Sequence, residues 1–204
     1  MINTIIISSS GSITIDVIDE KLKIIAPAET KTKLINNKLY MEMEQTQFAG
    51  FNNISMGYGS SITINGVQIG HQPAKTSTEP PVEHLFDHHD IQKIKVSGSA
   101  HVNVLTKLNF KTLSLNGSGV IKADGQYDTL NLTLNGSGGI RLGNATIKNA
   151  CISLNGSGSI KDFAVTDNIN CSLNGSGSIK GCALTNTMIN KCKNGSGSIS
   201  IKKS

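Results

Sequence analysis

Along the second half of the chain, apolar and polar residues alternate with period two and then meet a glycine-rich turn. The turn phrase Asn-Gly-Ser-Gly occurs five times, and its asparagines are 19, 20, 19 and 20 residues apart (Asn116, Asn135, Asn155, Asn174 and Asn194). A degenerate copy, Val96–Ala100, precedes them. A short fixed period of this kind indicates stacked supersecondary units, each of which buries its apolar face only against its neighbours.

The alternation places three side chains of each repeat on the buried face of a strand. They stand five, three and one residues before each asparagine: Lys111, Leu113 and Leu115; Leu130, Leu132 and Leu134; Ala150, Ile152 and Leu154; Ile169, Cys171 and Leu173; Ile189, Lys191 and Lys193. The fifth residue after each asparagine is always isoleucine: Ile121, Ile140, Ile160, Ile179 and Ile199. In the last copy Lys191 and Lys193 replace inward aliphatics, as expected of a polar terminal cap.

These columns predict an all-β protein, a parallel β-helix (β-solenoid) with coils of 19–20 residues over residues 91–204. Coils stacked about 4.8 Å apart would align the asparagine amides in a structural ladder, each donating to the next. The serines of the turns would form a second ladder (Ser118, Ser137, Ser157, Ser176 and Ser196). An antiparallel meander is the alternative, because Asn-Gly is also a strong hairpin signal. We favour the β-helix, because like positions recur in every copy.

The first ninety residues follow a different pattern. Residues 1–70 are predicted to be an N-terminal β-rich capping region, in which Gly11–Ile15 echoes the Gly-Ser-Ile phrase of the repeats. Residues 71–90 are polar and contain prolines, which predicts a linker or a long loop. Alternating residues predict strands in the first region at Ser12–Ile18, Leu22–Ile25 and Lys38–Met43, the last preceded by an Asn36-Asn37 turn.

The recurring Gly-Ser-Gly-(Ser/Gly)-Ile phrases and the strand pattern ending in Asn37–Met43 carry a family resemblance. They resemble the autotransporter-adhesin head domain family, often called head-GIN, over both halves of the chain. The resemblance implies a β-helical fold, an adhesin role and no known enzymatic activity. Two features depart from the family pattern: the export signal that members usually carry is missing, and residues 71–90 look like an insertion.

Charge is distributed unevenly. Residues 1–90 hold six Lys and ten Asp or Glu, a net charge of −4, whereas residues 91–204 hold twelve Lys, one Arg and four Asp, a net charge of +9. This asymmetry suggests either docking of the two halves or an anionic partner for the second. The sixth residue after the asparagine is a candidate anion-binding position in four copies: Lys122, Arg141, Lys161 and Lys180.

In a stacked β-helix these four cations would form a line, and a polyanion would offset their mutual repulsion. Nucleic acid, a phosphorylated glycan or an anionic lipid surface would each serve. The alternative is a solvated face whose lysines discourage edge aggregation. No aromatic side chains interleave with the cations, which argues against base stacking.

Metal and redox chemistry have few candidates. His84, His88 and His89 are the only imidazole cluster, and on a helix the spacing of His84 and His88 would let both reach one Zn²⁺. A polar loop is the alternative for this short segment, and we expect neither a metal nor a cofactor. The four cysteines occupy different columns and match no zinc motif, so we expect free thiols, with Cys171 in the core.

Catalytic candidates are also few. Asp128 and Asp167 would lie two coils apart, about 10 Å, which is too wide for a retaining glycosidase and at the limit for an inverting one. The repeat serines have no histidine nearby that would act as a base. We therefore expect no enzymatic activity. A glycan-active enzyme is the third and last of three function classes that the sequence leaves open.

The first class is a non-enzymatic structural or adhesive module that mediates protein–protein contacts, with self-association. The second is a polyanion- or glycan-binding module that uses the basic column. The sequence has no apolar run of the roughly 18–20 residues that a membrane span needs. Met1–Ile7 lacks the features of a secretory signal, so we expect a cytoplasmic protein. The Ile, Asn and Lys bias is typical of an AT-rich bacterial or large viral genome, and a viral source would indicate the virion.

Overall fold

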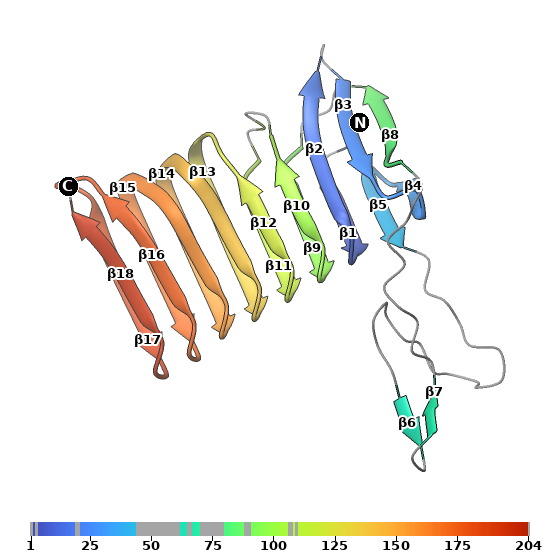
Figure 1. The fold of residues 1–204 in the computed structure, drawn as a ribbon. Helices are drawn as coiled ribbons and strands as arrows, with labels where there is room; N and C mark the ends of the chain where they lie inside the picture. The colour runs from blue at the N-terminus through green and yellow to red at the C-terminus, as the bar shows by residue number, and fades with distance from the viewer. Residues whose placement is uncertain are drawn as a thin grey trace.

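The chain forms a rod of stacked β-strands (Figure 1). The computed structural model describes residues 2, 4–18, 21–43, 62–64, 67–69, 80–87, 91–105, 108 and 110–203. The strands before the repeats are β1 (Thr4–Ser9), β2 (Ser12–Ile18), β3 (Lys21–Ala26), β4 (Thr30–Ile35), β5 (Lys38–Met43), β6 (Ile62–Ile64), β7 (Val67–Ile69) and β8 (Val82–Asp87). The strands of the second half are β9 (Lys93–Gly98), β10 (His101–Val104), β11 (Thr112–Gly117), β12 (Val120–Ala123), β13 (Gln126–Gly136), β14 (Gly139–Gly156), β15 (Ser159–Asn174), β16 (Ser178–Ala183), β17 (Met188–Asn194) and β18 (Ser198–Lys203).

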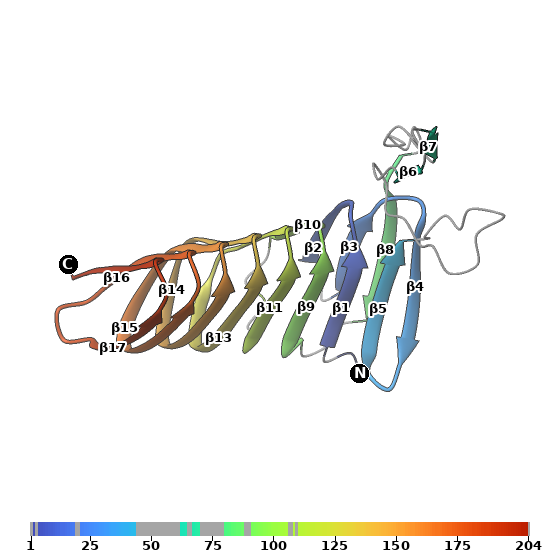
Figure 2. The same ribbon diagram turned by 90° about the horizontal axis from the view of Figure 1, so that it is seen from below.

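Two parallel faces make up the rod (Figure 2). On the first face, β1, β9, β11, β13, the later parts of β14 and β15, and β17 follow one another. On the second face the order is β2, β10, β12, the earlier parts of β14 and β15, β16 and β18. All of these pairings are parallel, and like positions of successive repeats lie side by side. The parallel β-helix is therefore confirmed, and the antiparallel meander is wrong.

The predicted columns form a narrow aliphatic core between the faces. Ile121, Ile140, Ile160 and Ile179 are buried in one column, and Ile199 packs partly buried against it in the last coil. Cys171 is buried among the inward residues of the first face, as predicted. In the last coil, Lys191 and Lys193 are exposed, which agrees with their expected role as a polar cap.

The prediction that Lys111 points inward is wrong. Its side chain is exposed, and a bend there lets the N–H groups of Lys111 and Thr112 both donate to the carbonyl oxygen of Gln92. Phe110 is fully buried instead, with its ring centroid 5.0 Å from that of Tyr127. The Tyr127 hydroxyl donates to the Asp124 carbonyl oxygen at 3.0 Å. Burial raises the pKa of Tyr127, and the nearby Asp124 carboxylate raises it further.

Residues 4–18 supply the first coil of the solenoid, because β1 and β2 continue the two faces. The echo at Gly11–Ile15 is thus a true coil position, with Ile13 in register with Val102. Two extensions follow at this end. Beyond β1, β5 pairs in parallel and β4 then pairs antiparallel with β5. Beyond β2, β3 and then β8 pair antiparallel. Asn36 and Asn37, both at positive φ, form the predicted turn between β4 and β5.

Part of the segment expected to be a linker is a strand. Val82–Asp87 is β8, paired antiparallel with β3, with an ion pair between Lys23 and Glu83. Strand β8 ends the strand order beside β3, and an edge strand tolerates prolines directly before it. Residues 71–79 and 88–90 lie outside the described residues, so the domain boundaries at 70 and 90 stay a prediction.

Glycine corners join the two faces. In five successive corners, the N–H of the second glycine donates to the carbonyl oxygen of the first glycine of the preceding coil, at 2.9–3.1 Å. The first glycines have positive φ, which L side chains rarely adopt. A Cβ on Gly175 (φ 124°) would lie 2.5 Å from the carbonyl oxygen of Gly156. The corner therefore needs glycine both for its conformation and for the close approach of successive backbones.

We expect Gly175→Ala to destabilise the fold by about 2 kcal/mol or more, because it adds left-handed strain to a backbone clash. Gly139→Ala is the matched control, since its Cβ would meet no atom nearer than 3.6 Å and its φ is not in the left-handed range. We expect the control to change stability by less than about 1 kcal/mol. Urea unfolding followed by circular dichroism measures both. Similar losses in the two variants would contradict the proposed constraint.

Candidate functional site

An amide ladder runs along the corner of the first face. The Nδ2 of Asn135 donates to the Oδ1 of Asn116 at 2.8 Å, and the Nδ2 of Asn155 donates to the Oδ1 of Asn135 at 2.9 Å. Asn174 and Asn194 continue the same column in register. The predicted asparagine ladder is therefore present as hydrogen bonds from Asn116 to Asn155, and Asn174 and Asn194 share its column without a further amide bond among the described residues. The hydroxyls of Ser176 and Ser196, 3.2 Å apart, form one step of the expected serine ladder.

Two further amide pairs on the first face were missed by the sequence analysis. The Nδ2 of Asn168 donates to the Oδ1 of Asn149 at 2.8 Å, and the Nδ2 of Asn190 donates to the Oδ1 of Asn170 at 2.9 Å. Each pair occupies one column over only two coils, so the signal was present in the alignment but short. These bonds fix the orientations of outward polar side chains between coils.

From β11 to β17, the outward side chains nearest the corner of this face carry no charge, and we call this surface the neutral face. It combines three outward positions from each of β11, β13, β14, β15 and β17, in register from coil to coil. Its members are at least partly exposed: Thr112, Ser114, Asn116, Asn131, Thr133, Asn135, Cys151, Ser153, Asn155, Asn170, Ser172, Asn174, Asn190, Cys192 and Asn194. Hydroxyl and amide groups dominate it, so it offers hydrogen bonds rather than an electrostatic field.

The four predicted cations lie in one column on the second face, which we call the basic column. Lys122 pairs in register with Arg141, Arg141 with Lys161, and Lys161 with Lys180. Lys161 is half-buried and the other three are exposed. The structure thus brings these residues together, one on each coil. Anion binding by them stays a proposal.

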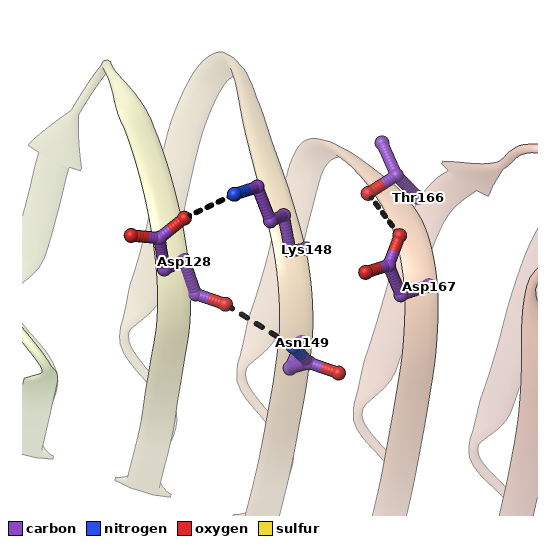
Figure 3. Close-up of polar contacts among 5 residues, drawn as sticks. All are labelled: Asp128, Lys148, Asn149, Thr166 and Asp167. Atoms are coloured by element: carbon purple, nitrogen blue, oxygen red, sulfur yellow. Dashed lines mark hydrogen bonds and ion pairs between the residues drawn. The ribbon is translucent and has the colours of Figure 1, made fainter.

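Charged residues at the start of β13 and in the middle of β14 pair with each other (Figure 3). The Nζ of Lys148 lies 2.6 Å from the Oδ1 of Asp128, and the Asn149 Nδ2 contacts the Asp128 carbonyl oxygen at 3.4 Å. The hydrogen bond from Lys148 lowers the pKa of the Asp128 carboxyl, and its positive charge adds to the effect. Asp128 in turn raises the pKa of Lys148, with a smaller contribution from Asp167.

This pairing argues against Asp128 as the general acid of a glycosidase. Lys148 interacts with both Asp128 and Asp167. The Thr166 hydroxyl donates to the Oδ1 of Asp167 at 2.8 Å. A general acid for glycosidic cleavage needs a raised pKa so that it stays protonated. Asp128 is shifted in the opposite direction, and the two acids serve as surface ion-pair and hydrogen-bond partners.

The histidine cluster is only partly described. His84 lies on strand β8, in register with Ile24, so the helical spacing that would bring His84 and His88 together does not apply to it. The Nε2 of His84 is buried and has no hydrogen-bond partner. His88 and His89 lie outside the described residues. Within the part of the chain that the structure describes, no group of three or more His, Cys, Asp or Glu could hold a metal ion.

All four cysteines are free thiols, as predicted. Cys151, Cys182 and Cys192 are exposed, whereas Cys171 is buried. Burial raises the pKa of the Cys171 thiol to about 12, against a smaller opposing effect of Lys191. The described residues also contain no helix long and apolar enough to cross a membrane.

Residues 87–204 match the family described as "Putative auto-transporter adhesin, head GIN domain". This range holds every coil of the repeat half, including both the neutral face and the basic column. Among curated proteins, none matches the chain.

Two solved structures are similar to the chain. A crystal structure described as a "Putative lipid binding protein" from Parabacteroides distasonis ATCC 8503 has a TM-score of 0.51 and 17% identity, covering 98% of this chain and 92% of that one. A second, described as a "putative cell adhesion protein" from Clostridium sporogenes ATCC 15579, has a TM-score of 0.31 and 12% identity, covering 99% and 93%. At such identities, the first likeness shows a shared fold only.

We expect Asn135→Ala to lower the free energy of unfolding by about 1 kcal/mol. The substitution removes two hydrogen bonds, the one that Asn135 donates to Asn116 and the one that it accepts from Asn155. Asn131→Ala is the control, an exposed asparagine on the same strand whose register neighbours are Thr112 and Cys151. Thermal unfolding compares the two. Equal effects would mean that the amide ladder adds nothing to stability.

We expect a thiol-specific chromogenic reagent to label the three exposed cysteines of the native protein quickly. Cys171 should react only after denaturation, because its thiol is buried and its raised pKa keeps it protonated at neutral pH. Cys171→Ala should leave the native count unchanged and lower the denatured count by one. Rapid labelling of all four native thiols would contradict the assigned core.

Proposed function

The chain belongs to the auto-transporter adhesin head GIN domain family, and on this premise we propose that it is a non-enzymatic adhesive module that contacts other protein subunits, including copies of itself. The neutral face carries this proposal. It is regular along five coils, and interchain amide and hydroxyl contacts on it would meet no charge repulsion. A charged face pressed against its own copy would instead place like charges together, which is costly.

The rigidity of the neutral face also supports adhesion. Its amide pairs join Asn116 to Asn135 and Asn155, and Asn170 to Asn190, so these side chains are oriented before any partner arrives. Less side-chain entropy is then lost on binding. Stacked polar side chains on paired sheets can form close interfaces between chains. The neutral face of a second copy has the same regular rows of polar side chains, so two copies can pair through this face alone.

The proposal of a non-enzyme draws on the charged side as well. Asp128 is ionised and paired with Lys148, so it is held in a surface ion pair rather than prepared to donate a proton. The family is described as an adhesin head domain, and the similar structure with a TM-score of 0.51 as a lipid-binding protein. These descriptions are consistent with binding rather than with chemistry.

Polyanion binding by the basic column is a second candidate function, favoured by the register of its four cations. Adjacent coils hold these like charges about 4.8 Å apart, a repulsive arrangement that a bound anion would relieve. The two functions use different faces, so one molecule can perform both.

The adhesive function predicts concentration-dependent self-association in sedimentation-velocity experiments. The variant Thr133→Arg/Ser153→Arg places two cations at adjacent positions of the neutral face. We expect it to weaken association at least tenfold, because like charges would then face each other between copies. The control Gln126→Arg/Thr146→Arg adds the same charge to exposed, adjacent positions at the start of β13 and in the middle of β14, outside the neutral face. A wild-type protein that stays monomeric, or equal weakening in both variants, would contradict association through the neutral face.

A further inference from the structure

We propose that the basic column binds a linear acidic polysaccharide, one with a carboxylate on successive sugars, lying along the solenoid axis. This inference rests on the polyanion binding proposed above and names its ligand class. Each coil supplies one cation, and coils repeat about every 4.8 Å. A sugar residue in an extended polymer has a similar length, so successive carboxylates can meet successive coils.

Two of the four cations have a second polar group beside them. Ser159 and Ser178 stand two residues before Lys161 and Lys180, on the same strands and hence on the same side of the sheet. Both serines are half-buried and in register with each other. On these two coils, a cation that binds the carboxylate and a serine that binds a sugar hydroxyl form a set of groups that fits one uronic acid on each coil.

Neutral hydrogen-bonding residues extend the column at both ends. Asn103 precedes Lys122 in register, and Ser200 follows Lys180. Thr14 lies one coil before Asn103. A polysaccharide has hydroxyl groups along its entire length, so it can use these positions as well as the cations. The central Arg141 adds a planar guanidinium, which binds a carboxylate through two parallel hydrogen bonds.

Two exposed carboxylates make the surface selective. Asp124 lies two residues beyond Lys122, and Asp162 follows Lys161 directly. They reduce the general positive field, so a ligand must align its acid groups with the cations. Dense, unspecific attraction of any anion is therefore weaker here than the number of lysines suggests.

The same surface is poorly suited to nucleic acid. The aromatic residues of the repeat half, Phe110, Tyr127 and Phe163, are all buried, so no ring is available for base stacking. The column lies on a sheet face formed by β12, β14, β15 and β16, and none of these described strands protrudes to enter a DNA groove. A membrane surface is also disfavoured, because the only apolar side chain among the outward positions beside the cations is the half-buried Val120.

The experiment is fluorescence anisotropy of a labelled oligogalacturonate with the full chain at about 50 mM and about 200 mM salt. We expect saturable binding that weakens on the order of tenfold over this range, because counterions are displaced from the ligand. The variant K122Q/R141Q/K161Q/K180Q should lose at least tenfold in affinity. Neutral dextran should not bind.

The matched control is K38Q/K93Q/K95Q/K111Q, which removes the same charge from the other side of the solenoid. Lys38 and Lys93 both pair with Thr4 of the first face. We expect this control to bind the oligogalacturonate within about threefold of wild type, since distant charges are screened. Equal loss in both variants would overturn the proposal in favour of net-charge attraction. If the quadruple column variant fails to fold, the variant R141Q/K161Q replaces it. We then expect a smaller loss of affinity for the oligogalacturonate, in the same direction.

The remaining outcomes distinguish a failure of the polysaccharide proposal from a failure of polyanion binding by the basic column. Column-dependent binding of duplex DNA or of phosphatidylserine vesicles, without oligogalacturonate binding, overturns the polysaccharide and leaves polyanion binding in place. The absence of binding to all three probes at low salt overturns both. Neither result bears on the neutral face, whose self-association is measured without any polyanion.

Discussion

Every other feature of this protein depends on the contact between successive glycine corners. The N–H of the second corner glycine reaches the first glycine of the preceding coil, and a Cβ at Gly175 would occupy the space that this contact needs. The contact leaves little freedom for one coil to slide against the next. The corner, where the chain changes direction, therefore sets the register between successive coils. The strands on both faces pair in that register.

A fixed register turns isolated residues into surfaces. One asparagine at a turn makes a local hydrogen bond, but Asn116, Asn135 and Asn155 in register make a continuous chain of amides. The same rule aligns four cations on the second face. The solenoid thus presents a neutral surface and a basic one at different orientations, without a cavity or a catalytic centre being required for either.

The sequence was sufficient wherever a residue could be counted from a corner. The isoleucine column, the amide ladder and the basic column all lie within six residues of an asparagine. Counting farther from a corner is less reliable, because β14 and β15 change register between Arg141 and Ala145 and again between Ile147 and Asn149. Asp128 and Lys148 lie in one column, each seven residues before an asparagine, but their pairing was not predicted because this column repeats no single residue type.

The other errors also have physical causes. Lys111 sits in an apolar column, but the chain bends there, and Phe110 fills the space instead. Strand β8 was missed because its pairing with β3 joins residues about sixty positions apart, with prolines directly before it. A local pattern carries no information on such a distant partner. The first coil at residues 4–18 was likewise separated from the repeats in sequence, although Ile13 occupies the same position as the later isoleucines.

Because every corner has the same geometry, a coil is an exchangeable unit of length. Removal of residues 156–174 would join Asn155 directly to Gly175 and restore an intact corner phrase. The shortened rod would lose one cation, Lys161, and one rung of amides, with the remaining columns still aligned. Duplication of a coil would do the reverse. Valency on both faces therefore scales with coil number, so binding strength can be altered by recombination between repeats without the design of any new contact.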